Sequence, residues 1–598
     1  MHKLKPIIID LVLLLIITVP AFIRILNNQY FSMHDDQHIA RLFLLDQGLK
    51  QGYLYPRWVD GLGFGFGYPL YNFYPPLIYF VGEFFHILGF SLIWSIKLII
   101  VTGFYLGAVG IYLFVKKFTN RVSGMLSATL YTYFFYHAVL IYVRGALAEF
   151  FSLAILPFVF LALENLTYKT NLRNGIFFGI SIALLILSHP LIALPALLFI
   201  GLFFLYNFVK SRFNSRFIYF FIFSVLLGFS LSAFFWLPSM VERKFTLTEK
   251  ILTGELASYR LHYIYPQQFI YSPWGYGGSG AGLADGVTFQ LGKINIGLAL
   301  MSLIFGILYF LRKKRSDSSF YFYQLTIILL FFSLFMTTED SSFIWDRVKY
   351  LWYLQFPWRF LTFTAIFISI AGGYSVFFLF RLIEQYFQPQ RLEILSRRSI
   401  YHFFVAVLVI GTIFTYQKYF KPQRYFQTND RERTSFKEIS WRISRTSYEF
   451  VPKDVKTTKS ELNTTILSIK KENLPKKPYE IISGDGVVSI INNKYKEKEF
   501  FIEAKTPLSF RLNTYNFPGW KAYLNGQKVK SEDNNDFKLI TISIPSGKQT
   551  IKFIFENTPV RNIANFISLV TIGFLVTLNL FQHLNLNKKQ ILKPRQTR

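Results

Sequence analysis

Long apolar runs alternate with short polar segments along most of the chain. A run of about 20 apolar residues is long enough to cross a bilayer as a helix. The pattern therefore predicts twelve membrane-spanning helices, at residues 7–26, 94–115, 121–141, 146–165, 173–188, 190–208, 216–237, 292–311, 319–336, 360–382, 401–417 and 563–583. A further apolar stretch, 76–92, begins after a proline, and we expect it to lie at the membrane interface or to re-enter the membrane without crossing.

Basic segments between these runs predict the topology. They are "KKFTNR" (Lys116–Arg121), "KSRFNSR" (Lys210–Arg216), "RKKR" (Arg312–Arg315), the arginine-rich loop 381–398 and the tail 587–598. Cytoplasmic loops of membrane proteins carry an excess of Lys and Arg. Placing all of these segments and the basic N-terminus on one side requires an even number of crossings, which twelve satisfies. We therefore predict a multi-pass plasma-membrane protein with both termini in the cytoplasm.

The region 419–562 differs from the rest of the chain because it is rich in Lys, Asn, Ser and Thr. In "QTIKFIFEN" the alternation places Ile551, Phe553 and Phe555 on one face, as in a half-buried strand. We expect a polytopic α-helical membrane domain at 1–418, an extracytoplasmic β-sandwich-like domain at 419–562, and a final helix with a basic tail at 563–598.

Composition agrees with this assignment and excludes other classes. The chain has 598 residues, of which 52% are hydrophobic and only 16% are charged. The net charge is +30, and its basic clusters fall in short loops between apolar runs, so they indicate anionic lipid headgroups as partners and not nucleic acid. The absence of cysteine excludes disulfides, thiol catalysis and thiolate metal sites.

The first outer loop opens with "SMHDDQH", which contains Asp35 and Asp36 between His34 and His38. Ser32 and Asp35 have the spacing of a helix N-cap, so a simple capping role is one interpretation. Asp36 is not needed for capping, however, and the two histidines lie four residues apart, on one face of a helix. We therefore predict a functional acidic site, with Asp35 and Asp36 as candidate catalytic residues.

Other ionisable residues lie at the outer ends of predicted spans. "YVRGALAEFF" contains Arg144 and Glu149, "LSHP" contains His189, and "YLQFPWRFL" contains Arg359. Arg57 begins a loop rich in glycine and aromatic residues, which is either a tightly packed surface loop or the wall of a lipid or sugar groove. Charged groups at membrane depth indicate function, although a structural ion pair between Arg144 and Glu149 and an interfacial position of Arg359 remain alternatives.

These motifs resemble known families. The arrangement of a first helix, a loop with paired acids and a "YPP" entry to a short helix resembles the GT-C superfamily of polyprenyl-phosphate-sugar glycosyltransferases. More closely, "MHDDQHIARL", "GFGFGYPLYNFYPPL", "RGALAEF" and "LSHP" resemble a bacterial membrane-protein family labelled pyruvoyl-tetrahydropterin synthase-related. "YNFPGWKAYLNGQKV" near the C-terminus is similar to the outer β domain of YfhO-like proteins.

The resemblance to GT-C enzymes implies sugar transfer from a lipid-linked donor to a glycan, lipid or protein acceptor at the extracytoplasmic face. It implies that Asp35 activates the acceptor, that Glu149 is the second acid, and that a divalent cation such as Mg²⁺ or Mn²⁺ is bound, with Asp35, His38 and Glu149 as candidate ligands. Arg57, Arg144, Arg359 and His189 are the candidates for binding the donor phosphate.

Two further functions stay open from the sequence. The first is a transporter or flippase for a lipid-linked glycan, and the second is a non-catalytic assembly protein that binds glycan through its outer domain. Pterin synthase chemistry is disfavoured, because it requires a soluble fold with clustered histidines, whereas the nine histidines here are dispersed among apolar runs.

Overall fold

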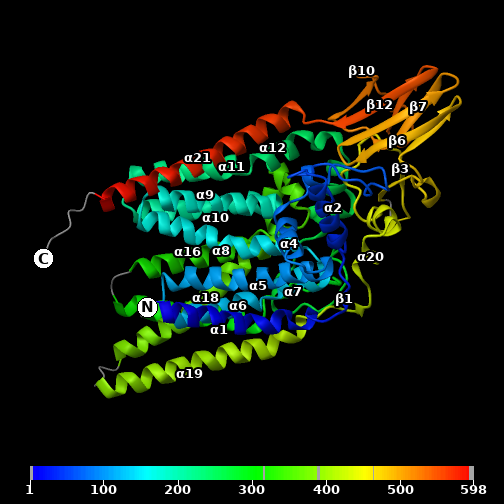
Figure 1. Ribbon diagram of the computed structural model, residues 1–598. Coiled ribbons are helices and arrows are strands. Elements are labelled where there is room, and N and C mark those ends of the chain that lie inside the picture. The colour runs from blue at the N-terminus through cyan, green and yellow to red at the C-terminus, as the bar shows by residue number, and fades with distance from the viewer. Residues whose placement is uncertain (1–3, 314–316, 387–390, 462–463, 592–598) are drawn as a thin grey trace.

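The structure is a computed structural model that describes all residues except 1–3, 314–316, 387–390, 462–463 and 592–598. The predicted basic segments at 312–315, 381–398 and 587–598 therefore lie partly outside the described residues. A bundle of long helices occupies most of the molecule, and a β-domain lies at one end of it (Figure 1).

The long helices correspond to the predicted spans. They are α1 (Leu4–Phe22), α5 (Leu92–Lys116), α6 (Arg121–Thr132) with α7 (Phe135–Ala138) and the π-helical turn η2 (Val139–Arg144), α8 (Leu147–Tyr168), α9 (Leu172–Ser188), α10 (Pro190–Lys210), α11 (Ser215–Leu231) with α12 (Ala233–Glu242), α15 (Lys293–Lys313), α16 (Ser318–Phe335), α18 (Leu361–Tyr386), α19 (Arg391–Tyr416) and α21 (Pro559–Ile591). Within the described chain, nine helices are long and apolar enough to cross a membrane, and two bent pairs raise that number to eleven. The twelfth predicted span is α9, which is apolar but shorter.

Helix α4 (Leu77–Ile87) is the element formed by the ambiguous stretch. Its 11 residues rise only about 16 Å, roughly half the thickness of the hydrocarbon core. It packs on α5 and on α2 (His38–Lys50) at the β-domain end of the bundle. The structure thus agrees with the expectation that this stretch does not cross the membrane.

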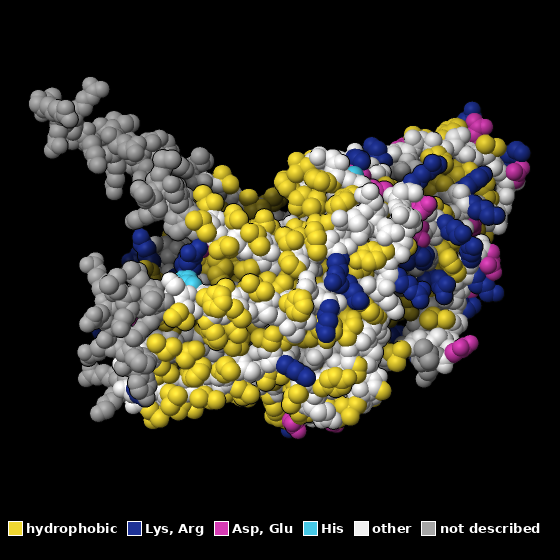
Figure 2. Space-filling view, turned by 90° about the horizontal axis from the view of Figure 1, so that it is seen from below, with side chains coloured by type: hydrophobic (Ala, Val, Ile, Leu, Met, Phe, Trp, Pro, Cys, Tyr) yellow, Lys and Arg dark blue, Asp and Glu magenta, His cyan; other side chains and the backbone are white. Residues whose placement is uncertain are grey.

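The outer surface of the bundle is apolar. Helices α8 and α18 are enclosed by their neighbours, whereas α19 and α21 expose side chains such as Phe414 (77%) and Leu569 (67%). Figure 2 shows hydrophobic side chains over the visible face of the bundle, with Lys and Arg side chains gathered at the β-domain end. A continuous apolar surface of this kind requires a lipid environment.

The β-domain is an antiparallel sandwich. Its strands are β5 (Tyr479–Ser483), β6 (Gly486–Lys494), β7 (Glu497–Ala504), β8 (Leu508–Tyr515), β9 (Trp520–Leu524), β10 (Gln527–Val529), β11 (Leu539–Ile544) and β12 (Gly547–Phe555). The sheet β10-β9-β12-β7-β6 packs on the sheet β11-β8-β5, and Phe500, Phe510 and Phe553 contact one another between them. Ile551 and Phe555 are buried on the same face as Phe553, as the alternation predicts.

A less regular segment joins the bundle to the sandwich. It contains β2 (Tyr425–Phe426), which pairs with β1 (Tyr30–Phe31) of the first loop, together with α20 (Asp430–Arg433), β3 (Thr457–Lys459) and β4 (Thr465–Leu467). Shorter helices at the same end are α3 (Leu70–Phe73), α13 (Thr248–Leu252), α14 (Pro266–Ile270) and α17 (Ser342–Arg347).

The glycine-rich part of the first loop docks the β-domain, whereas the end of the same loop, at Phe73, Tyr74 and Pro75, lines the cavity described below. Gly63 and Gly67 have positive φ angles, and a Cβ atom would lie 2.8 Å from Tyr515 at Gly63 and 2.8 Å from Trp58 at Gly67. The backbone N–H of Tyr515 donates to the carbonyl of Phe66 at 3.2 Å. Gly63 therefore permits the close contact between the loop and the sandwich, and Gly67 permits the tight packing of the loop on its own Trp58.

Candidate active site

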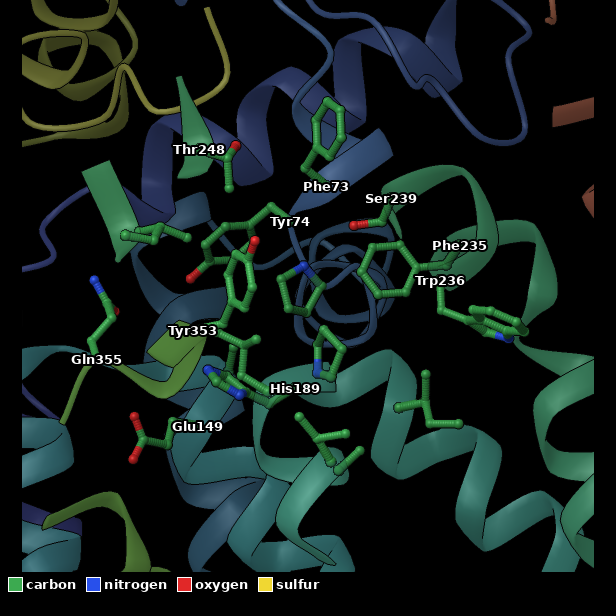
Figure 3. A pocket seen from close by; sticks show the side chains of 18 of the residues that line it. Phe73, Tyr74, Glu149, His189, Phe235, Trp236, Ser239, Thr248, Tyr353 and Gln355 are labelled. Carbon is green, nitrogen blue, oxygen red and sulfur yellow. The ribbon is translucent and has the colours of Figure 1, made fainter. Parts of the chain in front are cut away.

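A cavity of about 780 Å³ lies at the β-domain end of the helical bundle. Part of its wall is polar and comes from the first loop, the η2–α8 turn and the segment 350–359 that precedes α18. The opposite part is apolar and comes from α9, α10 and α12. Figure 3 shows Glu149 and His189 on one side of the cavity and Phe235, Trp236 and Ser239 of α12 on the other.

Backbone hydrogen bonds hold Asp35 at this cavity. The N–H of Asp35 donates to the carbonyl of Arg144 at 2.8 Å, and the N–H of His34 donates to the carbonyl of Val143 at 3.0 Å. Gly145 follows with φ +69°, and a Cβ there would lie 2.6 Å from the sulfur of Met33. The first loop is thus clamped onto the turn that precedes α8, so that Asp35 and Glu149 line the same cavity.

The Asp35 side chain is half-buried on the cavity wall. Within the described part of the chain, no hydrogen bond or ion pair engages its carboxylate. An ionised carboxylate in a partly closed site, without a fixed partner, is available to accept a proton from a bound molecule.

Glu149 is bound on both of its carboxylate oxygens. Oε2 pairs with Arg144 Nη1 at 2.8 Å and with Arg359 Nε at 3.1 Å, and the Tyr136 hydroxyl donates to Oε1. Glu149 is 1% exposed, and Arg359 also donates from Nη1 to the carbonyl of Leu354 at 2.6 Å. Glu149 therefore fixes two arginines at the cavity and is not a free base.

His189 caps α10. Its Nδ1 accepts a hydrogen bond from the backbone N–H of Ile192 at 3.1 Å, so Nε2 carries the hydrogen in the neutral ring. Among the described residues, Nε2 has no hydrogen-bond partner, and the ring lines the cavity. The side chain can thus donate a hydrogen bond to an oxygen of a bound molecule.

The apolar wall extends along α10 from Leu191 to Ile200, about 14 Å of helix. Residues of α9 and α12 complete it, and they are Ile182, Leu185, Ile186, Phe235, Trp236 and Met240. This wall lies in the membrane-spanning part of the bundle. An apolar chain fits it better than a polar one, because a polar chain would lose its hydration there.

Arg243 is a cavity residue that the sequence analysis did not identify. It directly follows α12, stacks over the ring of Tyr353 at 4.4 Å, and makes no ion pair within the described residues. The only sequence signal is its place just beyond an apolar run, which does not distinguish it from other interfacial basic residues. Arg41 and Glu449 were missed in the same way, and both line the cavity.

Asp36 and Arg57 are not at the cavity, which corrects the expectation for both. Asp36 pairs with Arg433 and, at 3.2 Å, with Arg442, and burial raises its pKa against the pull of these two arginines. Arg57 is buried and donates to the carbonyl of Phe234 at 2.6 Å. Asp36 ties the first loop to the segment after α19, and Arg57 ties it to α12.

The proposed metal ligands do not form a site in the structure. Both ring nitrogens of His38 are engaged, because Nε2 donates to the carbonyl of Gly145 at 2.5 Å and the hydroxyl of Tyr79 lies 3.1 Å from Nδ1. Burial lowers the pKa of His38 to about 3, so the ring is neutral. Across the described ranges, no three His, Asp or Glu side chains are grouped so that they could hold a metal ion. Asp35, His38 and Glu149 therefore do not fit the expected cation, and we derive no step through one.

The fold and the cavity define a polytopic helical membrane protein with a β-sandwich near its C-terminus. The chain belongs to the family described as 6-pyruvoyl-tetrahydropterin synthase related domain, membrane protein, whose model matches residues 71–419, more than half of the chain. The family resemblance noted from the sequence is thus confirmed. No curated protein matches the chain.

Several solved structures are similar to the chain. Arabinofuranosyltransferase AftD from Mycobacteria is 12% identical, with 71% of this chain and 27% of that chain covered and a TM-score of 0.45. Oligosaccharyltransferase AglB from Archaeoglobus fulgidus is 14% identical, with 69% and 56% covered and a TM-score of 0.37. ArnT from Cupriavidus metallidurans is 11% identical, with 64% and 81% covered and a TM-score of 0.29. The chain thus spans about a quarter of the length of AftD.

Proposed function

We propose that the protein is a membrane glycosyltransferase, which moves a sugar from a polyprenyl-phosphate donor to an acceptor at the face of the membrane that carries the β-domain. One observation carries this proposal: an unengaged carboxylate, Asp35, shares a cavity with arginines and with a long apolar wall. A lipid-linked sugar phosphate has matching parts, namely an apolar tail, an anionic phosphate and a reacting carbon.

In this reaction Asp35 accepts the proton of an acceptor hydroxyl while the hydroxyl oxygen bonds to the anomeric carbon of the donor. The bond between that carbon and the phosphate oxygen breaks, and polyprenyl phosphate leaves with the electron pair. Positive charge near the leaving oxygen stabilises it. Arg243 and the Nε2–H of His189 have free bonding capacity for this role, and Arg144 and Arg359 add positive charge next to them.

The donor tail is expected along the α10 wall, since this is the extended apolar part of the cavity. With the tail in this position, we expect the donor phosphate beside Arg144, Arg243 and Arg359 and the sugar next to Asp35. Transport is less well supported by the geometry, because the charged groups of the cavity gather at one end of the bundle.

The test is Asp35→Asn in proteoliposomes, with radiolabelled polyprenyl-phosphate-linked hexoses and pentoses as donors and methyl glycosides as acceptors. Loss of the general base is expected to lower transfer by about 10² to 10⁴-fold. Asp36→Asn is the matched control, because it makes the same change one residue away, outside the cavity, and it should retain most of the activity. Full activity of Asp35→Asn would refute the proposal, and a loss of activity supports it only if Asp35→Asn elutes and melts like the wild type. Flipping of the lipid-linked sugar by Asp35→Asn would favour a transporter.

A further inference from the structure

The cavity has a second polar surface that the reaction described above does not use. It is formed by Arg41 of α2 and Glu449 of the segment between α19 and the β-domain, with Tyr74 and Phe450 beside them. We infer that this surface, named here the Arg41–Glu449 subsite, binds the sugar ring of a glycan acceptor. The inference rests on the proposed function and deepens it by naming the class of the acceptor.

The two charged groups are close to each other but have bonding capacity to spare. Arg41 is 2% exposed, and its Nη2 lies 2.8 Å from the hydroxyl of Ser447 and 3.7 Å from Glu449 Oε1. Its Nε is buried without a hydrogen-bond partner among the described residues, and the Ser447 hydroxyl lies 3.4 Å from Glu449 Oε1. A buried guanidinium and a carboxylate with unused donors and acceptors are suited to the adjacent hydroxyls of a sugar.

Aromatic rings line the same part of the cavity. The Arg41 guanidinium lies 3.8 Å above the ring of Tyr74, and the rings of Phe73 and Phe450 stack at 5.3 Å. A ligand pocket of this kind combines apolar faces with a few oriented polar groups. A sugar ring presents both, because its C–H groups cover its faces and its hydroxyls project from its edge.

The wall that carries Glu449 is fixed in place. The Thr248 hydroxyl donates to the carbonyl of Glu449 at 3.2 Å, and the N–H of Leu247 donates to the carbonyl of Val451 at 3.1 Å. Burial raises the pKa of Glu449, and the negative charge of Asp35 adds to this increase. Asp35 lines the same cavity as Glu449, so a hydroxyl held by Glu449 shares that cavity with the proposed base.

The position of the subsite favours the acceptor over the donor. The donor tail needs the apolar wall of α9, α10 and α12, and its phosphate needs Arg243, Arg144 and Arg359. The Arg41–Glu449 subsite is formed instead by the first loop and the segment after α19. A donor bound along α10 leaves it free for the acceptor.

Saturation-transfer NMR on the detergent-purified full chain tests the subsite, with methyl hexosides and methyl pentofuranosides as probes. At least one glycoside should bind, and Glu449→Gln should weaken its binding at least tenfold. Thr446→Phe, at an exposed position of the cavity wall, should block the same site without removing a charge. Glu532→Gln, at an exposed carboxylate of the β-domain, is the matched control and should bind like the wild type.

Two results would overturn the inference: no glycoside of the panel binds the wild type, or Glu449→Gln and Thr446→Phe both bind as tightly as the wild type. Failure of the proposed function gives a different result, namely full transfer by Asp35→Asn while Glu449→Gln still weakens glycoside binding. If both proposals hold, the two variants differ. Asp35→Asn should lose transfer while it keeps glycoside binding, whereas Glu449→Gln should mainly raise the acceptor KM. Unchanged binding in both Glu449→Gln and Thr446→Phe, together with lost transfer in Asp35→Asn, would reject the subsite alone.

Discussion

The two ends of the helical bundle both bury acidic side chains, but they use them differently. At the end opposite the β-domain, Asp10 of α1 is 2% exposed and pairs with Lys116 at 3.1 Å and with Arg121, and the hydroxyl of Tyr112 donates to it. Its oxygens are thus fully engaged. It joins α1 to the end of α5 and the start of α6.

At the β-domain end, some charged groups are engaged and others are not. Glu149 resembles Asp10, because its oxygens are taken up by two arginines and a tyrosine. Asp35 and Arg243 differ from both, because they line a cavity and make no ion pair within the described residues. A buried charge is therefore evidence for function only when it has bonding capacity left and a space in which to use it.

The largest effect is expected from Glu149→Gln. This change leaves the Arg144 and Arg359 guanidinium groups in the interior with a neutral partner, and breaking a buried pair in this way costs about 3–5 kcal/mol. The arginines should also move from the cavity wall, so sugar transfer should be lost. Thermal unfolding in detergent and the transfer assay measure the two effects.

Asp10→Asn is the corresponding change at the other end of the bundle. Lys116 and Arg121 are partly exposed and can turn towards water, so the destabilisation should be smaller, about 1 kcal/mol. Transfer per folded molecule should equal that of the wild type. An equal loss of transfer in both variants would show that the two ends do not differ in the way described.

The next effect in size concerns the donor. Arg243→Gln should raise the KM for the polyprenyl-phosphate sugar by about 10- to 100-fold, because a charge-assisted contact to phosphate is lost. It should also reduce the amount of polyprenyl phosphate that co-purifies, which mass spectrometry measures.

Lys244→Gln is the matched control for Arg243, since it removes one positive charge from the exposed neighbouring residue. An equal rise in KM in both variants would mean that only the general positive potential of the face matters. In that case Arg243 would not contact the phosphate.

The fold could be predicted from the sequence because its signals are local. The apolar runs and the basic loops determine where helices cross, and the alternation around Phe553 predicts a strand of the sandwich. Asp35 and Glu149 could be selected from the sequence as candidate site residues because an acidic group at the end of a spanning helix is unusual.

The partners of these residues could not be predicted, because they depend on contacts between distant segments. Asp36 looks equivalent to Asp35 in the sequence, but its partners Arg433 and Arg442 lie 397 and 406 residues away. Glu449 lies in an unremarkable polar stretch, and only the fold places it on the cavity wall. The four-residue spacing of His34 and His38 suggests that His38 is a metal ligand. Its ring instead forms a hydrogen bond with the carbonyl of Gly145 and so holds α2 against the turn before α8.

The smallest effect is expected from Asp36→Asn, which tests whether the adjacent acids of the first loop have different roles. Arg433 keeps a second partner, Glu438 at 3.0 Å, so the loss should be about 1 kcal/mol. The change should lower the unfolding midpoint slightly and speed proteolysis of the segment after α19, while the kcat of transfer stays within about twofold. A residue that only ties the loop to the segment after α19 can affect the rate of transfer only through the stability of the protein. A loss of kcat as large as that of Asp35→Asn, without any change in unfolding, would therefore place both carboxylates in the reaction.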